Sequence, residues 1–162
     1  MTTNSPALVP PDTTLAPSCT LSRIYLKDSS FELPYGANIF TAVEPLNVDF
    51  AINLSQLSLD GDFIEASLRV TLTAKLNGKT AFIIEVTQCG IFEVKNISPE
   101  NFEKIRMTYV PAVLSPYVRA ALTDILGRAT LPQFMLPEID WGQAYASTLS
   151  APVALTASTT VH

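Results

Sequence analysis

Residues 64–94, IEASLRVTLTAKLNGKTAFIIEVTQCGIFEV, predict two long strands joined by a tight turn. Asn77-Gly78 between two alternating runs is a strong hairpin signal, because both residues tolerate the positive φ of a type I′ turn. A turn centred there sets Leu76 against Lys79 and Leu72 against Ile83. One face of the hairpin then carries Leu68, Val70, Leu72, Ala74, Ala81 and Ile83, and the other carries Phe82, Ile84, Val86 and Phe92. Both faces are apolar in this register, so we expect one of them to be covered by another subunit or by a bound protein.

The composition also favours association. The 162 residues are 48% hydrophobic and only 15% charged, with a mean hydropathy of +0.27. A chain of this length predicts one domain, and so few charges cover its surface poorly. No apolar run reaches the length of a membrane span, and the first residues lack the basic and apolar segments of a signal peptide. The net charge of −5, with no basic stripe, argues against a nucleic-acid partner.

The ends of the chain differ from its middle. Residues 1–18 are rich in Pro, Ser and Thr, and residues 150–162 contain no acidic or basic side chain except His162. We expect a disordered tail over 1–18, a folded domain over 19–149 and a flexible tail over 150–162. The two cysteines, Cys19 and Cys89, could form a disulfide, but free thiols in a reducing cytosol fit their positions better.

Strands come first in the chain and helices later. Residues 21–27 and 48–54 predict two further strands, with a breaker-rich crossover between them. Ser98-Pro99-Glu100 predicts a helix start, Pro111 its end, and Ser115-Pro116 the start of a second helix. Asp140 can cap a last short helix that has Trp141, Ala144 and Tyr145 on one face. This order predicts an α+β fold. The second helix carries an apolar stripe of Leu114, Tyr117, Val118, Ala121, Leu122 and Ile125.

Little in the sequence points to catalysis. His162 is the only histidine, so neither a Ser-His-Asp triad nor a zinc site of His and Cys is expected, and no Gly-rich phosphate loop is present. We expect no enzyme activity, metal or cofactor. Glu85 interrupts an apolar strand opposite Val70 in the assumed register. It has two interpretations, a gatekeeper against edge-to-edge aggregation or part of an electrostatic docking surface.

Four motifs in order resemble the SecB family of bacterial protein-export chaperones. Arg23–Pro34 is similar to Arg-Ile-Tyr-x-Lys-Asp-x-Ser-Phe-Glu-x-Pro of that family, and Thr80–Phe82 with Gln88–Phe92 is similar to its Thr-Ala-Phe and Gln-x-Gly-Ile-Phe. Pro111–Arg119 and Leu131–Leu136 resemble Pro-x-x-Leu-x-Pro-Tyr-x-Arg and x-Pro-Gln-x-x-Leu. The similarity covers about residues 21–146. It implies a four-stranded antiparallel sheet with helices packed on one face, assembled as a dimer of dimers.

The resemblance implies a function and site residues by position. The expected activity is that of a cytoplasmic, ATP-independent holdase, which binds unfolded precursor proteins and passes them to the SecA motor. A SecA-docking face matches Asp28, Glu32, Ile83 and Glu85, whose carboxylates would attract a basic partner in a salt-sensitive way. A client groove between crossover and last helix matches Tyr25, Phe31, Phe40, Trp141 and Tyr145, and a subunit interface matches Ile84, Val86, Gln88, Tyr117, Ala121 and Ile125.

The chain departs from the family pattern in the crossover. Members often carry a Trp where this chain has Val43 or Glu44, which affects one client subsite. Three alternatives remain open from sequence: a SecB-like chaperone of an antitoxin, a protein that binds small apolar ligands, and a purely structural oligomer.

Overall fold

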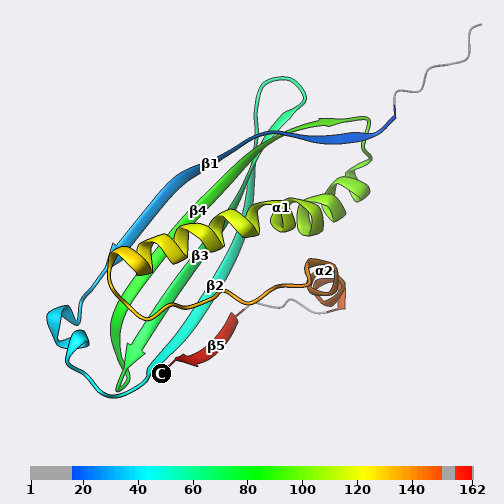
Figure 1. The fold of residues 1–162 in the computed structure, drawn as a ribbon. Helices are drawn as coiled ribbons and strands as arrows, with labels where there is room; N and C mark the ends of the chain where they lie inside the picture. Colours follow the sequence, from blue (N-terminus) through cyan, green and yellow to red (C-terminus); the bar gives the residue numbers. More distant parts are fainter. Residues whose placement is uncertain (1–15, 151–155, 162) are drawn as a thin grey trace, which may run out of the picture.

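The computed structural model describes residues 16–150 and 156–161, so most of the predicted N-terminal tail lies outside the described residues. An antiparallel sheet, strongly twisted, has its strands in the order β1-β4-β3-β2-β5, and two helices lie on one of its faces (Figure 1). The predicted α+β class is thus confirmed, as is the antiparallel sheet of the four predicted strands, to which β5 adds a fifth strand beside β2. The elements are β1 Ser18–Glu32, a 3-10 helix Gly36–Phe40, β2 Leu46–Ser58, β3 Phe63–Leu76, β4 Lys79–Lys95, α1 Pro99–Arg128, α2 Trp141–Ser150 and β5 Thr156–Val161.

The hairpin forms at the predicted turn, but its register is not the predicted one. Asn77 and Gly78 both have positive φ, and Leu76 faces Lys79. One residue later the ladder is irregular, because Lys75 pairs with Thr80 whereas Ala74 pairs with Phe82. An extra residue in one strand is a β-bulge, and beyond it every β4 side chain points to the opposite face from the predicted one.

The bulge gives the sheet one apolar face and one polar face, so the prediction of two apolar faces was wrong. Leu72 faces Ile84, not Ile83, and Val70 faces Val86. Glu85 lies opposite Thr71, not Val70, on the polar outer face. The helix-covered face carries the buried side chains Ile64, Leu68, Val70, Leu72, Ala74, Phe82, Ile84, Val86 and Phe92.

A single long helix replaces the two that were predicted. Helix α1 runs through both Pro111 and Pro116, so the predicted break at Pro111 was wrong. Ser98 caps its start by accepting a hydrogen bond from the Asn101 amide, with Pro99 in the first turn, as predicted. Within the helix, the Ser115 hydroxyl donates to the Pro111 carbonyl at 2.6 Å. The prolines remove two amide donors without ending the helix, because its packing against β3 and β4 holds it.

Toward the end of the chain, the short helix α2 was predicted from sequence and the strand β5 was not. Asp140 caps α2 by accepting a hydrogen bond from the Gln143 amide at 2.9 Å, and Trp141 is buried, as predicted. The expected flexible tail over 150–162 was wrong in part, because residues 156–161 form β5 against Leu46–Ala51 of β2. The segment TASTTV is rich in β-branched residues, which suit an edge strand.

Candidate functional site

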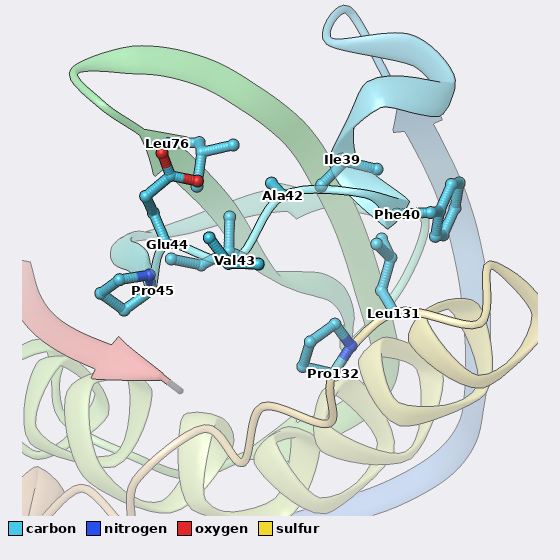
Figure 2. A pocket seen from close by; sticks show the side chains of 10 residues that line it. Ile39, Phe40, Ala42, Val43, Glu44, Pro45, Leu76, Leu131 and Pro132 are labelled. Atoms are coloured by element: carbon cyan, nitrogen blue, oxygen red, sulfur yellow. The ribbon is translucent and has the colours of Figure 1, made fainter.

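An open cavity of about 350 Å³ lies beside the crossover, on the side of the sheet where the helices pack. Figure 2 shows the crossover residues along one side of it and Leu131 and Pro132, which follow α1, along the other. Val43 is 95% exposed and Phe40 is 53% exposed, so apolar side chains stand at its mouth. The full lining is Ile39, Phe40, Ala42, Val43, Glu44, Pro45, Leu46, Leu76, Leu131 and Pro132. An apolar, open site of this kind can bind varied apolar side chains.

The structure brings only one of the five predicted client residues to this cavity, namely Phe40. Phe31 packs on Phe82 with ring centroids 6.3 Å apart. Trp141 is buried at the start of α2, and Tyr145 is partly buried in the same helix. Tyr25 points to the outer face of the sheet, where it meets Glu65. Sequence reasoning missed Leu131 and Pro132 as lining residues, although both belong to a family motif.

A second, smaller cavity of about 120 Å³ lies between the proline-containing part of α1 and the segment that leads into α2. It is lined by Ala112, Ser115, Pro116, Arg119, Leu136, Pro137, Glu138, Ile139 and Trp141. The Nε atom of Arg119 is buried without a hydrogen-bond partner. The cavity therefore combines an apolar wall with one unsatisfied donor.

The outer face of the sheet brings together the four residues predicted to dock a partner. Glu32 lies directly opposite Ile83, and Glu85 lies opposite Ser30, two residues from Glu32. Asp28 pairs with Thr87, the next outward position along β4. Alternate residues of adjacent strands share a face, so the four side chains form one surface, which we call the acidic strip. Strand β4 is internal, so the structure argues against Glu85 as an edge gatekeeper.

Glu85 differs from the other two carboxylates of the acidic strip. Its Oε1 lies 3.7 Å from Nη1 of Arg69, and its Oε2 accepts a hydrogen bond from Thr71 at 3.0 Å. Asp28 and Glu32 form no ion pair within the described part of the chain. Two carboxylates of the strip are thus unpaired, and one has a counter-ion.

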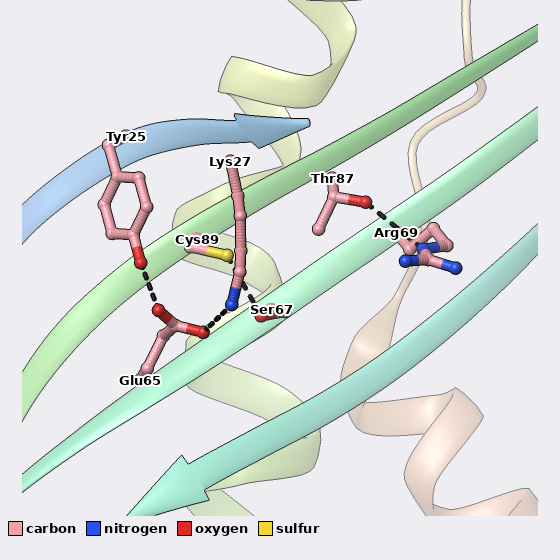
Figure 3. Close-up of polar contacts among 7 residues, drawn as sticks. All are labelled: Tyr25, Lys27, Glu65, Ser67, Arg69, Thr87 and Cys89. Atoms are coloured by element: carbon pink, nitrogen blue, oxygen red, sulfur yellow. Dashed lines mark hydrogen bonds and ion pairs between the residues drawn. The ribbon is translucent and has the colours of Figure 1, made fainter. Parts of the chain in front are cut away.

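Next to the strip, a polar cluster bridges β1 and β3 across β4 (Figure 3). Tyr25 and Lys27 both donate to the carboxylate of Glu65. The hydrogen bond from Lys27, followed by that from Tyr25, lowers the pKa of Glu65, and the same contact raises the pKa of Tyr25. Close by, Cys89 is buried, with its Sγ 3.0 Å from the Ser67 hydroxyl. Both cysteines are free thiols, as predicted.

The predicted subunit-interface residues fall into two groups. Ile84, Val86 and Gln88 are buried on the sheet face that α1 covers, so they offer no surface to a second copy and this part of the prediction was wrong. The bulge is again the reason, since it turns these side chains toward the helix. On α1, Tyr117 is exposed, and Ala121 and Ile125 are partly buried.

Neither described helix is both long and apolar enough to cross a membrane. Among the same described residues, no three His, Cys, Asp or Glu side chains gather where they could hold a metal ion.

Comparison with known proteins gives the family. The model of the family described as preprotein translocase subunit SecB matches residues 12–151. The protein-export protein SecB of Bordetella avium (strain 197N) is 37% identical over 135 residues, which cover 83% of this chain and 78% of that relative. That of Pseudomonas aeruginosa (strain LESB58) is 39% identical over 136 residues, which cover 83% of each chain.

The fold has a solved counterpart. The Mycobacterium tuberculosis SecB-like chaperone, in complex with a ChAD peptide from the HigA1 antitoxin, superposes with a TM-score of 0.61 at 14% identity, over 75% of this chain and 90% of that one. At this identity the likeness supports the fold alone. By the match over residues 12–151 and by its curated relatives, the chain belongs to the SecB family of protein-export chaperones.

Proposed function

We propose that this chain is an ATP-independent holdase that binds unfolded precursor proteins in the cytoplasm and passes them to the SecA motor. The observation that carries the proposal is the placement of two different surfaces on opposite sides of one sheet. The open apolar cavity lies on the helix side, and the acidic strip lies on the outer face. A client and a basic partner can therefore be bound at the same time.

The cavity suits clients of varied sequence. Its lining is mainly aliphatic side chains and prolines, so affinity comes from buried apolar area, about 25 cal/mol per Å², and needs no particular sequence. A volume of about 350 Å³ holds only a few side chains of an extended chain. Each contact is then weak and reversible, and several copies of the cavity on one assembly would bind a long client by avidity.

The acidic strip suits a basic partner. Asp28 and Glu32 have no counter-ion in the described chain, and Ile83 adds an apolar side chain at one end of the strip, opposite Glu32. Complementary charge speeds association and makes it sensitive to salt. The resemblance to the SecB family suggests SecA as that partner. The proposed activity requires only binding, without catalysis or a cofactor.

We also propose a homotetramer arranged as a dimer of dimers. Apolar side chains remain exposed on the single chain, among them Leu26 and Phe31 on β1 and Tyr117 on α1. Monomeric proteins rarely leave many large apolar side chains together in water. Burial of Tyr117, with Ala121 and Ile125, against another copy would cover part of this surface.

The test is a titration against a reduced, unfolded secretory precursor without ATP, followed by light scattering of the aggregating precursor. We expect suppression at near-stoichiometric tetramer. Val43→Asp places a charge at the mouth of the cavity and should weaken suppression several-fold. Leu57→Asp is the control, since Leu57 is also exposed but lies at the far end of β2.

Two results would contradict the proposal. The first is an intact oligomer that suppresses nothing, which would assign the cavity another use. The second is protection of an antitoxin but not of precursors, which would favour the antitoxin-chaperone alternative. Equal effects of Val43→Asp and Leu57→Asp would reject the cavity as the client site.

A further inference from the structure

We infer that Arg69 acts as an internal competitor at the acidic strip, occupying Glu85 until a basic partner displaces it. The inference rests on the proposed docking function of the strip and adds a residue that sets its affinity. Nothing in the four family motifs marks Arg69, and its side chain is 52% exposed on the outer face of β3.

The geometry holds the guanidinium beside Glu85. Nε of Arg69 donates to Oγ1 of Thr87, the residue directly opposite it on β4, at 3.2 Å. From that position Nη1 lies 3.7 Å from Oε1 of Glu85. The other carboxylate oxygen of Glu85 accepts from Thr71. Both partners of the ion pair are therefore held by neighbouring threonines, as Figure 3 shows for Arg69 and Thr87.

Arg69 also stands where a partner would enter. It lines a polar hollow of about 460 Å³ on the outer face, together with Lys27, Asp28, Asn53, Ser55, Ser67 and Thr87. Asp28 belongs both to this hollow and to the acidic strip. A lysine or arginine of a partner that approaches Asp28 thus also approaches the like charge of Arg69.

The ion pair between Arg69 and Glu85 is weak enough for a cation of the partner to displace Arg69. The Glu85 side chain is 30% exposed and that of Arg69 is more so, and ion pairs with this exposure are weak. A partner cation can therefore take the place of Arg69, although Arg69 opposes it. Removing Arg69 frees Glu85 and removes one like charge, so we expect binding about three- to tenfold tighter at low salt.

The experiment measures the Kd of the full chain for purified SecA by fluorescence anisotropy, at low and at high salt. The variants are Arg69→Gln and, as the matched control, Lys95→Gln. Lys95 is also a paired cation of the outer face, with Glu93 at 2.6 Å, but it lies about 30 Å along β4 from Glu85. We expect Arg69→Gln to tighten binding at low salt well beyond Lys95→Gln, with the gain shrinking at high salt.

A second background tests whether Arg69 acts through Glu85. When Glu85→Gln is already present, adding Arg69→Gln should give a much smaller gain, because only the like charge beside Asp28 is then removed. Arg69→Met repeats the test with a different neutral side chain, and thermal unfolding checks that both variants are folded. An equal gain with and without Glu85 would overturn the inference.

The outcomes separate the inference from the docking proposal. If Asp28→Ala with Glu85→Ala weakens SecA binding but Arg69→Gln leaves the Kd unchanged, Arg69 is no competitor and docking still stands. If the unmodified chain does not bind SecA, the docking proposal and the Arg69 inference are both overturned. The same holds if the Asp28→Ala, Glu85→Ala double variant binds SecA as tightly as the unmodified chain does. If Arg69→Gln weakens binding, Arg69 supports the docking surface and the inference is wrong.

Discussion

Glu65 joins two strands that do not pair with each other. From β3 its carboxylate accepts hydrogen bonds from Tyr25 and Lys27 of β1, across the intervening strand β4. Its side chain is only 13% exposed, and buried Cys89 and Ser67 lie close by. A largely buried carboxylate is stable when charged only if such donors remain.

We predict that Glu65→Gln lowers the free energy of unfolding by about 1–3 kcal/mol at neutral pH, the usual cost of losing hydrogen bonds to a charged group. The folded-state pKa of Glu65 lies below its ordinary value of 4.5, chiefly because of Lys27. The native state therefore binds this proton less readily than the unfolded chain does. The stability that Glu65 contributes is complete above its unfolded pKa and is lost as pH falls through the lower folded pKa.

Urea denaturation of both proteins at neutral and at strongly acidic pH checks this prediction. The gap in stability between the unmodified chain and Glu65→Gln should be large at neutral pH and should narrow in acid. Glu93→Gln is the control, because Glu93 pairs with Lys95 near the end of β4. A gap of the same size at both pH values would show that packing, and not the charge of Glu65, stabilises the cluster.

Among the elements, α1 packs against β4 at Gly90 with no room for a side chain. A Cβ atom there would lie 2.7 Å from Cε2 of Phe92 and 3.2 Å from Cδ2 of Leu114. Leu114 belongs to α1 and is fully buried, so it has little freedom to move. Gly90 therefore permits the close contact of helix and sheet, and not an unusual turn of the backbone.

We predict that Gly90→Ala lowers the free energy of unfolding by about 1–3 kcal/mol, because overpacking forces neighbouring side chains to shift. Gly127→Ala is the matched control in α1. There the nearest atom to a new Cβ is 3.8 Å away, so the better helix propensity of Ala should raise stability by about 0.5–1 kcal/mol. Thermal unfolding of both variants checks the pair. A gain in Tm for Gly90→Ala would contradict the close contact.

The elements also show where prediction from sequence succeeds. The Asn77-Gly78 turn and the caps at Ser98 and Asp140 were predicted, because each depends on a few adjacent residues. The bulge beside Ala74 was not, since a period of two contains no signal for one extra residue. That single residue turned Ile84 and Val86 from a predicted interface into the core.

In the candidate site, too, the part that lies in regular strands was predicted and the part formed by loops was not. Asp28, Glu32, Ile83 and Glu85 meet on one face because each lies in a strand, where sequence position fixes direction. The cavity is different, because its lining comes from the crossover and from the segment after α1, which follow no period. Of its residues, the predicted client set contains only Phe40, although the crossover subsite at Val43 or Glu44 also lies in the lining. Leu131 and Pro132 become neighbours of Val43 only through the tertiary fold.

For the whole molecule, the bulge changes the reason for expecting an assembly. The sequence predicted two apolar sheet faces, one of which would need a partner to cover it. The structure has one apolar face, and the chain's own α1 covers it, so this reason for expecting a partner no longer holds. The apolar surface that remains lies elsewhere, with Leu26 on β1, Tyr117 on α1 and Val43 in the crossover. Strand β1 is also the edge of the sheet, and its outer side has no pairing strand within the described chain.

We predict a tetramer of about 70 kDa, four times the 17.6 kDa chain, by light scattering at micromolar concentration. Tyr117→Asp should shift the mass toward that of the dimer, because a carboxylate on the outer side of α1 cannot be buried against another copy without a large desolvation cost. Leu57→Asp, at an exposed site far along β2, should leave the mass unchanged. A monodisperse monomer would contradict the assembly itself. A tetramer that survives Tyr117→Asp would place the interface away from the outer side of α1, and the open edge of β1 would then be the surface to vary.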